Sequence, residues 1–158
     1  MKKKIGIIGL GNPLRHDDGI GLVLLRYLQE HKKKLSRTIE LIDGGTSGMN
    51  LLHILEKYET IILIDAVDFK GIPGEIKKFS VDEIKSQKIP ILLSTHETDF
   101  LTVFSLATQL GKTPTDLEIF GIQPKNISPG IGLSPELQKV LRLLQNQILN
   151  EIQMKSGP

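Results

Sequence analysis

Hydrophobic residues along this chain gather in short runs that are typical of buried β-strands. Most of the runs are rich in isoleucine and leucine and end near glycine, proline or aspartate, as strands do. The predicted strands are Ile5–Leu10, Thr38–Ile42, Thr60–Ala66, Glu75–Phe79 and Asp116–Ile122. Thr60–Ala66 is the most apolar, so we predict that it lies at the centre of the sheet. Glu75–Phe79 follows a Gly-Pro-Gly turn and is predicted to be an edge strand.

Between the strands, apolar residues recur at the spacing of a helix. Ser134-Pro135-Glu136 has the residues of a strong helix start, with serine as the N-cap and proline at the first helical position. The predicted helices begin near Asp17 or Asp18, at Asn50, at Thr98 and after Ser134, and the last three end near Tyr58, Gln109 and Ile152. Strands that alternate with helices imply right-handed crossovers and a mostly parallel sheet covered on both faces. We therefore predict an α/β fold, with one domain over residues 1–158.

Composition excludes several classes of protein. The 158 residues have 39% hydrophobic residues and a net charge of +2, with 20 basic and 18 acidic side chains, so no basic surface for nucleic acid is indicated. The absence of cysteine excludes disulfides, a cysteine zinc site, an iron–sulfur cluster and a cysteine nucleophile. The apolar runs are far shorter than the roughly 18–20 residues of a membrane span. We expect a cytoplasmic protein that does not bind membranes and, without a long apolar helix face, a monomer.

Four polar segments follow predicted strands, at the edge where parallel α/β sheets bind their ligands. The segments are Gly9–Gly21, Asp43–Gly48, Asp65–Asp68 and Ser94–Asp99. The first does not match the G-x-G-x-x-G dinucleotide motif, because Leu14 stands at the position of the third glycine. Its two aspartates would also repel an anionic pyrophosphate at the helix N-terminus. No organic cofactor is predicted.

The acids are better suited to binding a cation or transferring a proton. Asp17 and Asp18 are adjacent, so their side chains point in different directions, and we expect one to cap the helix while the other faces the crevice. Asp65 ends the most buried strand, where a carboxylate needs a partner. Together with His96, such a set suits zinc or nickel or general acid–base catalysis. For each residue a structural role is the alternative: Asp43 forms a turn before Gly-Gly, and His96 lies on the surface.

Taken in order, these segments resemble the [NiFe]-hydrogenase maturation endopeptidases, the hydrogenase-processing protease family. The family pattern G-x-G-N-x-L-x-x-D-[DE]-G/A-x-G matches Gly9–Gly21, and D-G-G-T-x-G matches Asp43–Gly48. The apolar strand ending in D-A matches Ile61–Ala66, and S-x-H matches Ser94–His96. The resemblance covers nearly the whole chain.

The resemblance implies a specific fold, activity and site. It implies a three-layer α/β/α domain with a mostly parallel five-stranded sheet, and an aspartic-type endopeptidase. Members of the family remove a C-terminal peptide from the precursor of the hydrogenase large subunit after nickel insertion. Asp18, Asp65 and His96 match the family's metal-contacting residues, and they are the predicted catalytic and metal-binding residues here. The nickel then belongs to the substrate protein and acts as the recognition signal.

Two other functions remain open from the residues alone. The first is a free-standing zinc hydrolase of small substrates, although no H-E-x-x-H motif is present. The second is a binding module without catalysis, in which the acids cap helices and chelate a cation. Water activation by an acid or by the metal is also open.

Overall fold

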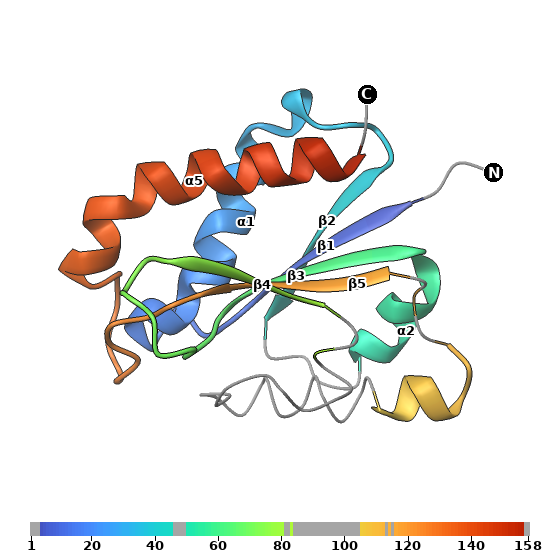
Figure 1. Cartoon of the computed structure of the whole chain (residues 1–158), viewed down its shortest axis with the longest axis horizontal. Helices are drawn as coiled ribbons and strands as arrows, with labels where there is room; N and C mark the ends of the chain where they lie inside the picture. The colour runs from blue at the N-terminus through green and yellow to red at the C-terminus, as the bar shows by residue number, and fades with distance from the viewer. Residues whose placement is uncertain are drawn as a thin grey trace.

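The computed structural model describes residues 4–45, 50–80, 83, 105–112, 114 and 116–156, and a five-stranded sheet forms its centre (Figure 1). The strand order is β2-β1-β3-β5-β4. β1, β2, β3 and β5 are parallel, and β4 pairs antiparallel with β5 at one edge. The strands are β1 (Ile5–Leu10), β2 (Ile39–Gly45), β3 (Thr60–Ala66), β4 (Ile76–Ser80) and β5 (Asp116–Ile122). The predicted α/β fold, the central position of β3 and the edge position of β4 are therefore confirmed.

Helices cover both faces of this sheet (Figure 1). Helices α1 (Ile20–Glu30) and α5 (Pro135–Ser156) lie on one face, and α2 (Asn50–Lys57) lies on the other. Two short 3₁₀ helices, η1 (His16–Gly19) and η2 (Lys32–Lys34), flank α1. Of the helix predicted over Thr98–Gln109, residues 105–109 are helical and the rest lies outside the described residues. None of the described helices is long and apolar enough to cross a membrane.

Each face of the sheet has its own hydrophobic core because side chains alternate along a strand. On β3, Ile62 and Ile64 pack toward α1 and α5. Ile61 and Leu63 of the same strand pack toward α2. All four side chains are essentially inaccessible to solvent, which explains why a continuous apolar run, rather than an alternating one, forms the central strand.

Tyr58 closes the core on the α2 face. Its ring lies over Gly6 of β1, where an added Cβ would come 2.8 Å from a ring carbon. The Tyr58 hydroxyl donates a hydrogen bond to the Glu40 carboxylate. Burial and this bond raise the pKa of Tyr58 to about 12, and the same bond lowers the pKa of Glu40. A glycine in a buried strand is thus explained by an aromatic ring that occupies the side-chain position.

Candidate active site at the carboxyl edge of the sheet

Close packing of α1 against the sheet positions the first pair of acids. An added Cβ on Gly21 would lie 2.2 Å from the Ile64 carbonyl oxygen and 2.3 Å from that of Leu10, so only glycine allows this approach. Gly11 has a φ of +137°, and an added Cβ there would lie 2.1 Å from the Asp18 carbonyl oxygen. These contacts bring η1, with its two aspartates, over the ends of β1 and β3, and η1 contacts β3 directly.

Asp18 and Asp65 lie at this edge on neighbouring segments. Asp18 is 1% exposed, and its Oδ2 accepts a hydrogen bond from the backbone N–H of Asn12 at 3.0 Å. Asp65, the next-to-last residue of β3, is 2% exposed, and its Oδ1 accepts a bond from the Ala66 N–H at 2.8 Å. Two carboxylates at this degree of burial require compensating partners. The structure therefore brings two of the three predicted site residues to one edge of the sheet.

Asp17 has a different role from the one predicted. Its fully buried carboxylate accepts three backbone hydrogen bonds, from Lys125 at 2.8 Å, Asn126 at 3.0 Å and Ser134 at 2.7 Å. The N-cap residues are Arg15 for η1 and Gly19 for α1, so the prediction that Asp17 or Asp18 is the N-cap was wrong. Asp17 instead joins η1 to the loop between β5 and α5.

Further hydrogen bonds join Arg15 and His16, at the start of η1, to the loop between β5 and α5. The Arg15 side chain donates from Nε to the Ile127 carbonyl oxygen at 3.0 Å. The backbone N–H of His16 donates to Gly130, and its ring Nδ1 lies 2.8 Å from the carbonyl oxygen of Gly132. His16 has a φ of 44°, a left-handed conformation that is uncommon outside glycine and is retained only when surrounding contacts hold it.

Two polar side chains beyond β3 and β5 have structural roles. The buried Gln123 accepts hydrogen bonds on Oε1 from the backbone N–H groups of Phe69 and Gly71, and its Nε2 donates to Asp68. The backbone N–H of Lys70 and the amide of Gln123 lower the pKa of Asp68. Sequence reasoning missed Gln123, and no local pattern points to it, because its partners are more than fifty residues away in the chain.

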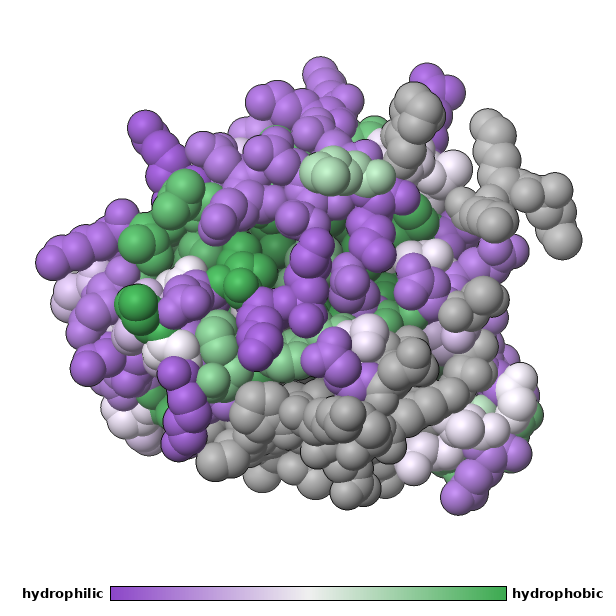
Figure 2. Space-filling view, in the orientation of Figure 1, coloured by the Kyte–Doolittle hydropathy of each residue, from purple (hydrophilic) through white to green (hydrophobic). Residues whose placement is uncertain are grey.

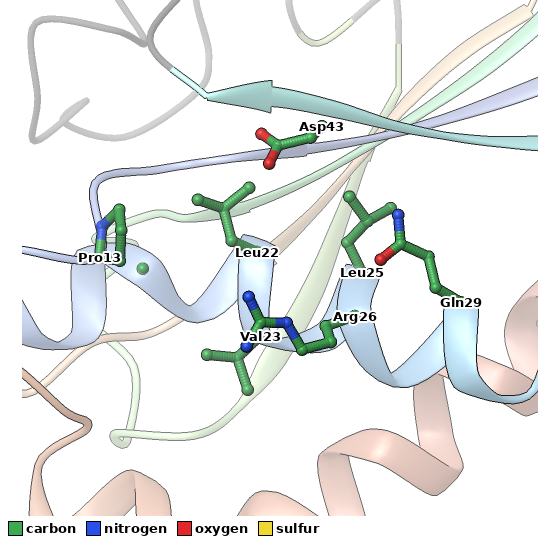
Figure 3. Close-up of a pocket in the computed structure, with 8 residues that line it drawn as sticks. Pro13, Leu22, Val23, Leu25, Arg26, Gln29 and Asp43 are labelled. Atoms are coloured by element: carbon green, nitrogen blue, oxygen red, sulfur yellow. The ribbon is translucent and has the colours of Figure 1, made fainter.

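Asp43 is exposed and lies beside a cavity of about 340 Å³ between α1 and the end of β2. Figure 3 shows its carboxylate near Leu22 of α1, which lines the cavity together with Arg26 of the same helix. Asp43 pairs with Gly9 of the neighbouring strand β1 and lies within β2, two residues before its end, so it is not part of a tight turn. Residues 46–49 of the D-G-G-T segment lie outside the described residues.

His96 and the whole Ser94–Asp99 segment also lie outside the described residues, so the third predicted site residue has no place in this geometry. Within the part of the chain that the structure describes, no group of three or more histidine, aspartate or glutamate side chains could hold a metal ion. The described site thus supplies two carboxylates, which can bind a cation or accept a proton.

Comparison with known proteins identifies relatives of this fold and site. The family model described as hydrogenase maturation protease matches residues 23–151. The chain is 30% identical to the Hydrogenase 2 maturation protease of Escherichia coli strain K12, over 92% of this chain and 88% of that one. The solved structure of hydrogenase maturating endopeptidase HybD from E. coli superposes with a TM-score of 0.83 at 28% identity, covering 98% of this chain and 94% of that one.

A third relative is longer than this chain. The hydrogenase expression/formation protein HupD of Thiocapsa roseopersicina is 34% identical over 86% of this chain. The chain spans 62% of the length of that protein and similar shares of several other relatives of this kind. The family match, the sequence identity and the fold agree, and we conclude that the chain belongs to the hydrogenase maturation protease family.

Proposed function

We propose that this protein is an endopeptidase that removes a C-terminal peptide from the precursor of a [NiFe]-hydrogenase large subunit. The proposal rests on the two buried carboxylates, Asp18 and Asp65, which come from different segments and both lie at the carboxyl edge of the sheet. It is supported by the name of the Escherichia coli relative, a Hydrogenase 2 maturation protease. The precursor is the partner protein, and nickel already inserted in that precursor is the signal that permits cleavage.

Charge explains why a cation would serve as the signal. Two carboxylates with little access to water bind a divalent metal more favourably than a neutral surface does. In this proposal Asp18, Asp65 and His96 contact the nickel of the precursor, and a precursor without nickel offers the two acids no cation. Cleavage then follows metal insertion because only the loaded precursor binds well, which is discrimination by differential affinity.

The chemical step is hydrolysis of one peptide bond. A water oxygen attacks the carbonyl carbon, the carbon–nitrogen bond breaks, and a proton from the water passes to the departing amine. A carboxylate of Asp18 or Asp65 can take up and return that proton, and the substrate's metal can polarise the carbonyl. The chain has no cysteine, so a thioester intermediate plays no part.

The test compares single variants in the cleavage of a nickel-loaded precursor. Asp18→Asn, Asp65→Asn and His96→Ala are expected to slow release of the peptide by at least about 100-fold, the usual contribution of a proton-transferring group. Asp116→Asn is the matched control. It makes the same change on an exposed side chain at the start of β5, at the edge of the sheet opposite the candidate site. Mass spectrometry of the precursor, with and without nickel, measures the loss of the peptide.

Other outcomes identify the other functions. Release of the peptide at the wild-type rate by all three variants contradicts the proposed site. A stable complex with the loaded precursor and no mass loss would instead show a binding module. Tight zinc binding by the purified chain, together with hydrolysis of small substrates and no action on the precursor, would show a free-standing zinc hydrolase.

A further inference from the structure

Two large hydrophobic side chains are exposed beside the acidic edge. Leu14 is 63% exposed and Ile131 is 83% exposed. Their loops are bonded to each other, since the backbone N–H of Gly130 donates to the Leu14 carbonyl oxygen at 2.8 Å and Arg15 forms a β-bridge with Gly130. We call Leu14 and Ile131 the apolar rim. Hydrophobic side chains reach the surface at the end of the molecule where these loops lie (Figures 1 and 2).

The backbone beneath the apolar rim is fixed by several contacts. The Asp17 carboxylate, the Arg15 side chain and the His16 ring all bond to the segment from Lys125 to Ser134. Because these loops are already ordered, a partner that binds to them does not have to pay for ordering the backbone. Exposed apolar side chains on a rigid surface next to a reactive site are characteristic of a place where another molecule binds.

The position of the apolar rim identifies its occupant. Leu14 lies four residues before Asp18, and the Asp18 carboxylate bonds to the backbone of Asn12 in the same loop. A polypeptide held with its scissile bond at Asp18 therefore passes next to Leu14. The neighbouring residues 127–134 contain no charged side chain, and Arg15, which follows Leu14, donates its Nε–H to the Ile127 carbonyl oxygen, so the surface suits an apolar segment.

We infer that the apolar rim binds an apolar segment of the precursor polypeptide beside the bond that is cut. This inference rests on the proposed function and adds the surface that binds the protein part of the substrate, separate from its metal. The rim does not take part in bond cleavage. Its loss is therefore expected to weaken binding of the precursor and to leave the rate at saturation almost unchanged, as removal of an interaction common to ground state and transition state does.

The experiment uses the double variant Leu14→Ala/Ile131→Ala and a matched control. The control is Leu143→Ala/Met154→Ala, which removes a similar amount of exposed apolar surface from α5, where the two side chains are 59% and 77% exposed. Cleavage of nickel-loaded precursor is measured against precursor concentration. The rim variant is expected to raise KM about tenfold, equivalent to about 1.4 kcal/mol, with kcat changed less than about twofold. The control is expected to keep wild-type values.

The outcomes separate this inference from the proposed function. Wild-type KM in the rim variant, or an equal rise in the control, overturns the role of the rim while peptide release by the wild-type protein still supports the protease. If the wild-type protein releases no peptide, the proposed function fails, and calorimetry of precursor binding still tests the rim by comparing the two double variants. Circular dichroism and urea midpoints verify folding, and Leu14→Asn alone serves as a second probe if the double variant is unstable.

Discussion

At the scale of single residues, the neighbours Asp17 and Asp18 show how much two adjacent acids can differ. The Asp18 carboxylate accepts a hydrogen bond from the backbone of Asn12 in the preceding loop, whereas Asp17 receives three backbone N–H groups from distant segments. The sequence alone indicates that adjacent side chains diverge. It does not indicate which acid is structural, because the deciding groups belong to residues 125, 126 and 134.

Asp17→Ala is expected to destabilise the protein by about 3 kcal/mol. The change leaves three buried backbone N–H groups without their acceptor, and each such group carries a desolvation penalty. Equilibrium urea unfolding followed by circular dichroism measures the loss. Asp43→Ala is the control, because its exposed carboxylate at the same edge makes no hydrogen bond among those identified in the described structure, and the expected change is within about 0.5 kcal/mol. Equal midpoints for the two variants would contradict the structural role of Asp17.

At the scale of elements, most strands were predictable because burial on both faces makes a strand a continuous apolar run. β3 and β5 begin and end at the predicted residues. β2 extends to Gly45 instead of Ile42 because its pairing with β1 continues through Asp43. The end of β2 therefore depends on β1, and the local sequence of β2 does not reveal it. A helix beginning near Asp17 or Asp18 was predicted, but not that its first turn is the separate 3₁₀ helix η1, because the contacts of η1 with other loops are not visible in a local hydrophobic pattern.

Helix α1 depends on one glycine for its distance from the sheet. Gly21→Ala normally stabilises a helix by about 0.5–1 kcal/mol, yet here the new Cβ would meet two backbone carbonyl oxygens. Since strand backbone cannot move aside, we expect a net loss of at least about 2 kcal/mol. The urea midpoint should fall, while Gln29→Ala on the exposed side of the same helix should leave it nearly unchanged. A stabilised Gly21→Ala variant would show that α1 does not pack as closely as described.

At the scale of the whole molecule, the two hydrophobic cores share one sheet. The side chains of β3 alternate between the cores. Loss of packing in one core therefore exposes strands on which the other core also depends. Small domains built in this way usually unfold in one cooperative step.

The two tyrosines allow this cooperativity to be measured. The chain has no tryptophan and two tyrosines, of which Tyr27 packs on the α1 and α5 side and Tyr58 on the α2 side. In Tyr27→Phe the fluorescence reports on Tyr58, and in Tyr58→Phe it reports on Tyr27. Within each variant we expect the urea curves from fluorescence and circular dichroism to coincide. Separate midpoints would show that the two faces unfold independently.

The bond between Asp17 and the Ser134 backbone joins positions that are 117 residues apart, and this distance has a consequence for when activity can arise. During synthesis, Asp17 leaves the ribosome long before Ser134 does, and contacts at such separation form late because a long loop must close first. A chain that has not yet been synthesised as far as Ser134 lacks this bond, so Asp17 is not yet held in its final position. The proposed protease activity, which needs the acids in place, therefore arises only after Ser134 has been synthesised.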